Sequence, residues 1–176
     1  WGEQNVLRDV VRVIRMDRPF VLISRFQGNA RDGHGNHSTA GLITQEAFKA
    51  AGDPQMFPDQ IADGLRPSQP FKVYIGGVRE NESWTLRIDP GEYSPWLGDS
   101  YANVPRLGLS FQRSQNSGRY TPQLGPSPSY YLRVATILNG ASAPEKERGF
   151  FDGIDTSTAG LFKLLGESPL PGGDAA

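Results

Sequence analysis

The chain has 176 residues, enough for one domain with a hydrophobic core, and its 37% hydrophobic and 21% charged content is typical of a globular protein. The net charge of −1, with both signs interspersed, argues against a basic footprint for nucleic acid or anionic lipid. The lack of cysteine excludes disulfides and cysteine-based zinc sites. No apolar run approaches the roughly 20 residues that a membrane span needs.

Both ends of the sequence indicate a piece of a longer protein. The chain begins with Trp1 rather than Met, directly before a helical pattern, and it ends in a Pro/Gly/Ala-rich segment. We therefore expect residues 1–166 to be part of one domain and residues 167–176 to be a linker-like tail. Further domains are expected in the parent chain. The compartment stays open between cytoplasmic and exported, because a leader would lie upstream.

The first half alternates helical and strand patterns. Apolar residues recur at helical spacing over residues 2–15. Residues 20–26 and 71–77 are short apolar runs typical of strands, and we expect the first to be covered on both faces. Between them, a glycine-rich loop at 27–36 leads into a predicted helix over 37–52. Its apolar face is predicted to hold Ala40, Ile43, Ala47, Phe48 and Ala51.

The second half has a less regular pattern. Strands are predicted over 83–89 and 129–138, a helix capped by Asn103 lies between them, and a short helix over 155–166 closes the chain. The sequence thus predicts an α/β, Rossmann-like layered fold with a mostly parallel sheet. We expect this sheet to be incomplete at its N-terminus and the second half to be β-rich. In such a fold the glycine-rich loop lies at the carboxyl ends of the strands, where ligands bind.

Both histidines of the chain, His34 and His37, lie in the loop segment "RDGHGNHSTAG". Two imidazoles three residues apart at a helix start can face one point, and neutral imidazole is both a zinc ligand and an acid–base group near neutral pH. The adjacent glycines allow close backbone approach, and the helix N-terminus favours a developing oxyanion. An ordinary turn is the competing interpretation, and two histidines alone do not complete a metal site.

The surrounding residues resemble a known family. The segments "VLRDVVRVIRMDRPFVLISRF", "RDGHGNHSTAGLITQEAFKAAGDPQMFPDQ" and "GLRPSQPFKVYIG" look like the later half of a PIG-L/LmbE-type deacetylase domain. This family contains zinc-dependent N-acetylglucosaminyl deacetylases. The resemblance covers roughly residues 1–117 and extends loosely through "GFFDGIDTSTAGL". The "RSQ" segment at 113–115 is also similar to a loop in a bacterial branch of the family.

The resemblance implies a role for each histidine. His37 would be a zinc ligand, and His34 would stabilise the oxyanion or act as the general acid. The remaining ligands and the base of the family come from a His-Pro-Asp-Asp motif, and this chain has no third histidine and no Asp-Asp pair. We therefore expect that motif upstream of Trp1, and we expect the 176-residue chain alone to bind zinc weakly, or another divalent metal in its place, and to be inactive.

The implied reaction is hydrolysis of an N-acetyl group on a small amino-sugar conjugate. Asp32 and Asn36 are candidates for orienting the metal-bound histidine, and Arg113 and Gln115 for contacting the sugar, although turn and surface roles compete for all four. No nucleic acid and no membrane span are expected. The alternatives are a non-catalytic carbohydrate-binding or interaction module, and a degenerate family member without metal. A set of aromatic residues in the second half permits the carbohydrate-binding alternative as a stacking wall, although core packing competes with that role: Trp84, Tyr93, Trp96 and Tyr101.

Overall fold

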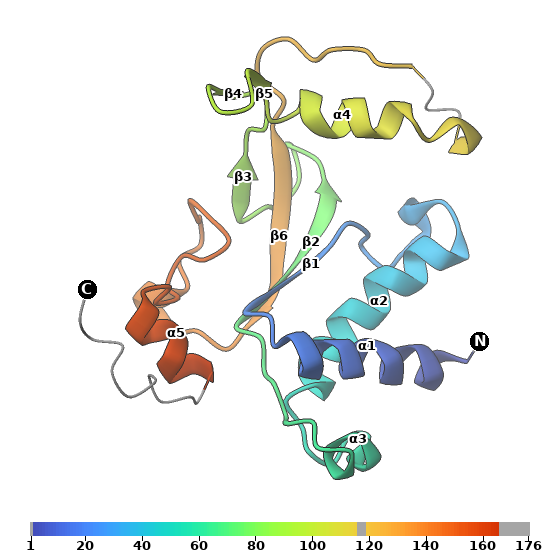
Figure 1. Cartoon of the computed structure of the whole chain (residues 1–176), viewed down its shortest axis with the longest axis vertical. Coiled ribbons are helices and arrows are strands. Elements are labelled where there is room, and N and C mark those ends of the chain that lie inside the picture. Colours follow the sequence, from blue (N-terminus) through green and yellow to red (C-terminus); the bar gives the residue numbers. More distant parts are fainter. Residues whose placement is uncertain (1, 116–118, 166–176) are drawn as a thin grey trace.

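The computed structural model describes residues 2–115 and 119–165, so the predicted tail at 167–176 lies outside the described residues. The chain forms an α/β fold in which the first two helices form a layer on one face of a small mixed sheet (Figure 1). The helices are α1 (Glu3–Asp17), α2 (Gly35–Ala50), α3 (Pro58–Ala62), α4 (Asn103–Ser110) and α5 (Thr158–Leu165), with short 3-10 turns at η1 (Ala30–Asp32), η2 (Arg113–Gln115) and η3 (Gly140–Ser142). None of the helices within the described ranges is long and apolar enough to cross a membrane.

The sheet has the strand order β1-β2-β6-β3. Its strands are β1 (Val21–Ser24), β2 (Lys72–Val78), β3 (Leu86–Ile88) and β6 (Ser129–Thr136), and a small hairpin is formed by β4 (Tyr93–Ser94) and β5 (Asp99–Ser100). Strand β1 pairs with β2 in parallel, whereas β6 is antiparallel to both of its neighbours. The prediction of a mostly parallel sheet is therefore wrong for the described strands. The reason is that an apolar strand pattern carries no information on strand direction.

The helical layer matches the sequence pattern closely. One cluster of buried side chains joins α1 to α2, and it consists of Leu7, Val11, Ile14, Ile43, Ala47, Ala50 and Ala51. The predicted apolar face of the second helix is confirmed except at Ala40, which is exposed. Helix α1 ends at Asp17 because Arg18 adopts a left-handed conformation (φ 50°) just before Pro19. Strand β1 differs from the prediction, since it lies at the sheet edge and Ile23 is 48% exposed.

A buried arginine fastens the helical layer to the loop that follows α2. The side chain of Arg15 is 2% exposed, and its guanidinium donates to backbone carbonyls at Ala51 (3.2 Å), Asp53 (2.7 Å) and Met56 (2.9 Å). It also donates to Oε1 of Gln60 at 3.0 Å. Carbonyl groups at a helix C-terminus have no partner within the helix, so the guanidinium supplies the donors that they need.

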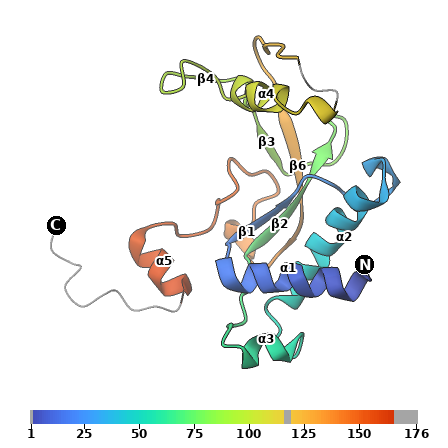
Figure 2. The same cartoon turned by 45° about the vertical axis from the view of Figure 1, so that its right-hand side comes forward.

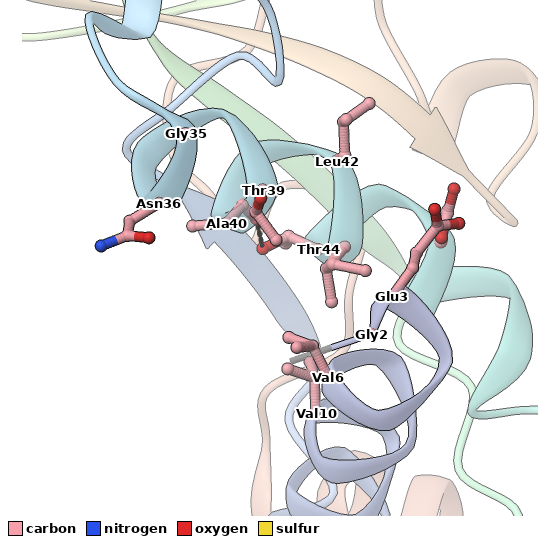
Figure 3. A pocket seen from close by; sticks show the side chains of 12 residues that line it. Gly2, Glu3, Val6, Val10, Gly35, Asn36, Thr39, Ala40, Leu42 and Thr44 are labelled. Atoms are coloured by element: carbon pink, nitrogen blue, oxygen red, sulfur yellow. Dashed lines mark hydrogen bonds between the residues drawn. The ribbon is translucent and has the colours of Figure 1, made fainter.

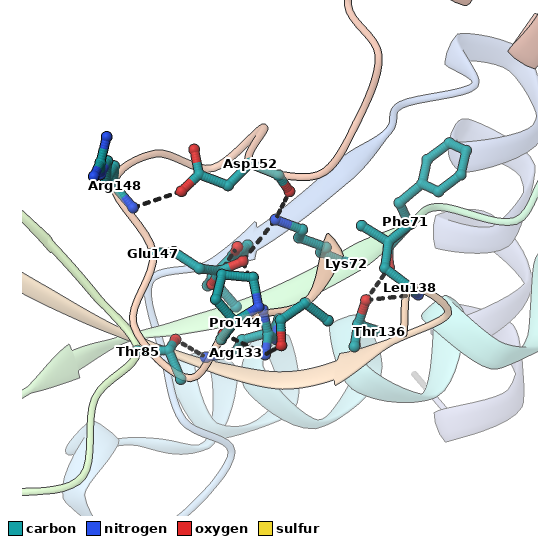
Figure 4. A network of polar contacts seen from close by, with 12 residues as sticks. Phe71, Lys72, Thr85, Arg133, Thr136, Leu138, Pro144, Glu147, Arg148 and Asp152 are labelled. Carbon is teal, nitrogen blue, oxygen red and sulfur yellow. Dashed lines mark hydrogen bonds and ion pairs between the residues drawn. The ribbon is translucent and has the colours of Figure 1, made fainter. Parts of the chain in front are cut away.

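The other face of the sheet is covered by residues 143–152 through an ionic network (Figure 4). Side chains alternate along β2, so Lys72 and Tyr74 face away from the helices. Glu147 lies between them and accepts from Lys72 at 2.6 Å, from the Tyr74 hydroxyl at 2.8 Å and from Arg133 of β6 at 2.6 Å. Burial and the neighbouring Glu147 carboxylate raise the pKa of Tyr74, so its hydroxyl remains a donor. This face is thus joined by charge together with the edge-on packing of Phe150 against Tyr74 and Tyr131.

Candidate functional site: a histidine pair at the end of β1

The loop that carries the histidines lies at the carboxyl end of the parallel strand pair, as predicted. It leaves β1 at Ser24 and is tied to the end of β2, where Gly77 accepts hydrogen bonds from Gln27 (3.0 Å) and Arg31 (3.3 Å). Arg31 also pairs with Glu82 at 2.7 Å. The loop is thus placed by long-range contacts as well as by its own turn.

The loop packs directly against α2, and this requires glycine at one position. A Cβ atom added to Gly41 would lie 2.1 Å from the backbone nitrogen of Gly28, a distance that no side chain tolerates. The "TAGL" stretch of α2 therefore lets the helix approach the loop backbone. This contact holds the N-terminal turn of α2, and with it both histidines, against the loop.

Asp32 organises the loop backbone through its carboxylate. The two carboxylate oxygens accept from the N–H groups of Gln27 (3.0 Å), Gly28 (2.7 Å) and Asn29 (2.9 Å). Partial desolvation raises the pKa of Asp32, but these three N–H donors and the nearby His37 outweigh it and hold the pKa below its usual value. The Asp32 carboxylate is therefore occupied by the loop and does not orient His37.

The His37 ring is held on two sides. Its Nδ1 lies 2.9 Å from the backbone carbonyl oxygen of Asp32, and the ring stacks on Phe26 with centroids 3.9 Å apart and planes 13° apart. A carbonyl oxygen can only accept, so Nδ1 carries the proton in this bond, and in the neutral ring Nε2 keeps its lone pair. Metal-binding histidines are commonly oriented by this kind of bond. The backbone carbonyl of Asp32, and not its carboxylate, therefore orients His37.

His34 stacks on the other side of His37. The two ring centroids are 3.7 Å apart and the planes are tilted by 31°. His34 occupies the N-cap position of α2 in an extended conformation, and its exposed ring makes no hydrogen bond to the helix. Because the lone pairs of an imidazole lie in the ring plane, stacked rings do not aim at one ion. The expectation that both rings face one point is therefore wrong, and the pair has one oriented and one exposed ring.

The remaining candidates are more dispersed. Asn36 is exposed and lines a cavity of about 790 Å³ between α1 and α2, where Val6 and Val10 face α2 (Figure 3). Arg113 is exposed in η2, which follows α4 along the chain. Gln115 closes η2, and its side chain is outside the described part of the chain.

Sequence reasoning missed Phe26 and Arg25. Phe26 is the last apolar residue before the loop, and it supports the His37 ring. Arg25 lines a second cavity, of about 540 Å³, beside Gly76 and Tyr131 at the carboxyl ends of β1 and β2. Both residues directly follow a strand, which is where ligand-binding residues are expected in an α/β fold. The apolar pattern, however, only indicated that Phe26 is part of the strand.

The donor set for a metal is incomplete in this part of the protein. Among the described residues, no group of three or more His, Cys, Asp or Glu side chains is close enough to hold a metal ion. His37 therefore offers one oriented nitrogen, and other donors are needed for any metal centre. No protein-family model matches the chain, and a search of curated proteins finds no match.

Proposed function

We propose that the chain belongs to a zinc-dependent hydrolase that removes an N-acetyl group from an amino-sugar conjugate, with His37 as a metal ligand. The carrying observation is the His37 ring, which is fixed by the Asp32 carbonyl and by Phe26 so that Nε2 keeps a free lone pair. The resemblance of the sequence to PIG-L/LmbE-type deacetylases supplies the reaction class, and we propose the Rossmann-like layered fold of that family on the same basis.

His34 is the acid–base group in this proposal. Its ring lies against His37 but is exposed, so it reaches a substrate bound over the loop. A protonated His34 donates to the oxygen that becomes negative during attack on the amide, or protonates the leaving amine, with a rate contribution of about 10²–10⁴-fold. The N-terminus of α2 lies at the same position and favours the same negative charge. When bound, zinc supplies a Lewis acid that polarises the amide carbonyl.

The proposal requires metal donors and a base in addition to His37. A second candidate is a domain of the same fold that does not bind metal, because His34 stacks on His37 rather than joining it as a donor. A third candidate is a carbohydrate-binding or interaction module, because the aromatic side chains of Tyr93, Trp96 and Tyr101 are exposed. Metal content and activity distinguish the hydrolase from both alternatives, because only the hydrolase needs both.

The test compares His37→Ala with His34→Ala in the full natural protein. We expect His37→Ala to lose bound zinc, and His34→Ala to keep zinc and lose about 10²–10⁴-fold in amine release from an N-acetylglucosamine derivative. Zinc is measured by elemental analysis, and circular dichroism checks the fold of each variant. We further expect the 176-residue chain by itself to bind zinc weakly and to release no amine.

Two results would contradict this assignment. Equal loss of zinc in both variants would refute the division of roles between the histidines. If the natural protein contains no zinc and releases no amine, with or without His37, the hydrolase is refuted. The carbohydrate-binding module and the metal-free domain are then the two remaining candidates.

A further inference from the structure

The cavity that Arg25 lines is formed at a bulge in β2. Between the paired positions Ile75 and Val78, two glycines of β2 lie opposite one residue of β6, Tyr131. Bulges of this kind are frequent beside active sites, because they interrupt strand pairing and redirect the chain. Glycine has no side chain, so a space of about 540 Å³ is left between the carboxyl ends of β1 and β2 and the start of β6. A cavity of that volume fits a small ligand rather than a protein surface.

The cavity lies on the face of the sheet away from α1 and α2. Leu22 of β1 packs on the helical cluster, and side chains alternate along a strand, so the cavity-lining Ile23 points the other way. The Tyr131 ring forms another wall, since it would lie 3.5 Å from a Cβ atom placed on Gly76. Phe150 packs edge-on against this ring with the centroids 5.0 Å apart. The aromatic wall is therefore supported by the segment that the ionic network joins to the sheet.

Arg25 supplies the only charged side chain among the described residues that line the cavity. No carboxylate of the described residues forms an ion pair with it, and its one ring contact is with Phe26. Its guanidinium donors are thus available to a ligand, and their planar fork matches two oxygens of a carboxylate or a phosphate. Ser129 and Tyr131 contribute hydroxyl-bearing side chains to the same lining. The cavity therefore favours an anionic group. A single arginine is too few for a nucleic-acid backbone, whose binding needs several cations.

The cavity adjoins the histidine pair through Phe26. The guanidinium carbon of Arg25 lies 5.9 Å from the centre of the Phe26 ring, and the same ring stacks on His37 with centroids 3.9 Å apart. Figures 1 and 2 show the connection from β1 to α2 beside the end of β2, where Gly77 lines the cavity and accepts hydrogen bonds from that loop. One small molecule can therefore reach both the guanidinium and His37.

We propose that this cavity binds an anionic group, a phosphate or a carboxylate, of the amino-sugar conjugate, and that Arg25 selects that group. The identity of the sugar rests on the proposed function, whereas the anion preference comes from the lining of the cavity. The acetamido group of the ligand lies at the histidine pair and the anionic group lies at Arg25. A neutral conjugate leaves the guanidinium without a partner and binds less tightly.

The test compares three N-acetyl amino sugars by isothermal titration calorimetry: N-acetylglucosamine, its 1-phosphate, and N-acetylmuramic acid, which carries a carboxylate. The full natural protein with His37→Ala is used, so that binding is measured without turnover. We expect at least one anionic sugar to bind about tenfold or more tightly than the neutral one, with a preference that falls as salt is raised. The tighter of the two anionic sugars identifies the group as phosphate or carboxylate.

Three variants locate the preference. Arg25→Gln should bind the three sugars equally, whereas Arg25→Lys should keep part of the preference because the charge remains. Arg66→Gln is the matched control, since Arg66 is an exposed arginine that follows α3, away from the cavity. This control should keep the full preference. Circular dichroism checks the fold of each variant.

Equal binding of the three sugars, or no binding of any, would overturn the proposal. So would a preference that survives Arg25→Gln or disappears in Arg66→Gln. The two proposals fail separately. Amine release by the natural protein without an anion preference refutes the anion site and leaves the hydrolase, whereas an anion preference without amine release keeps the anion site and refutes the hydrolase.

Discussion

The two faces of the sheet are covered in different ways. On one face, α1 and α2 pack through apolar side chains, and a single buried cation, Arg15, serves backbone carbonyls. On the other face, residues 143–152 are joined to the sheet by Glu147 with Lys72 and Arg133. The helices contribute mainly apolar side chains, whereas the extended segment adds buried charged partners to the packing of Phe150. Conservative substitutions in the apolar cluster of the first face should change the unfolding free energy little. Removal of one charge from the second face should lower it strongly.

The largest expected effect is that of Glu147→Gln. The side chains of Lys72 and Glu147 are fully buried, and Arg133 is 11% exposed. The variant keeps the shape of the side chain but leaves two buried cations without an anion, which costs about 3–5 kcal/mol of unfolding free energy. Urea unfolding followed by circular dichroism measures it. The exposed Glu145→Gln is the control, with an expected change within about 0.5 kcal/mol. A loss as small as that of the control would show that packing, not charge, joins this face.

Arg15→Met should have the next largest effect. Methionine fills much of the space but donates no hydrogen bond, so the carbonyls of Ala51, Asp53 and Met56 lose their partner. Buried acceptors left unpaired cost about 1–3 kcal/mol each before relaxation, and we expect a total loss of about 3 kcal/mol. Arg12→Met is the matched control, because Arg12 makes an exposed pair with Asp63 worth about 0–1 kcal/mol. Similar midpoints for the two variants in urea would mean that the apolar cluster alone holds this layer.

The smallest effect is expected for Asp32→Asn, and it depends on pH. The pKa of Asp32 is lower in the folded chain than in the unfolded one, so its contribution to stability is full above the ordinary pKa of about 3.9 and is lost as pH falls through the lowered value. The variant should therefore be less stable than the unchanged chain at neutral pH, and the difference should shrink in acid. Unfolding midpoints at several pH values measure this. The exposed Asp9→Asn serves as control, and a pH-independent difference would contradict the role assigned to the carboxylate.

The sequence predicted the elements of the helical layer well, because the recurrence of apolar residues at helical spacing is a local property of the sequence. Helical spacing located α1 and α2, and apolar runs located β1, β2 and β6 within a few residues. Asn103 was predicted as a helix cap, but α4 begins at Asn103, whose side chain instead joins Asp99 to Gln123. A polar residue before a helical pattern does not reveal which partner it will meet, since that partner lies about 20 positions further along the chain.

The candidate site likewise has features that the sequence predicted and features that it did not. The sequence by itself determined that both imidazoles occupy one glycine-rich loop between a strand and a helix, because that information is local. Only the tertiary structure decided that His37 is oriented by a backbone carbonyl and Phe26, and that His34 stacks on it rather than facing the same point. These relations depend on strand order and loop closure, which place residues together irrespective of their spacing in the chain.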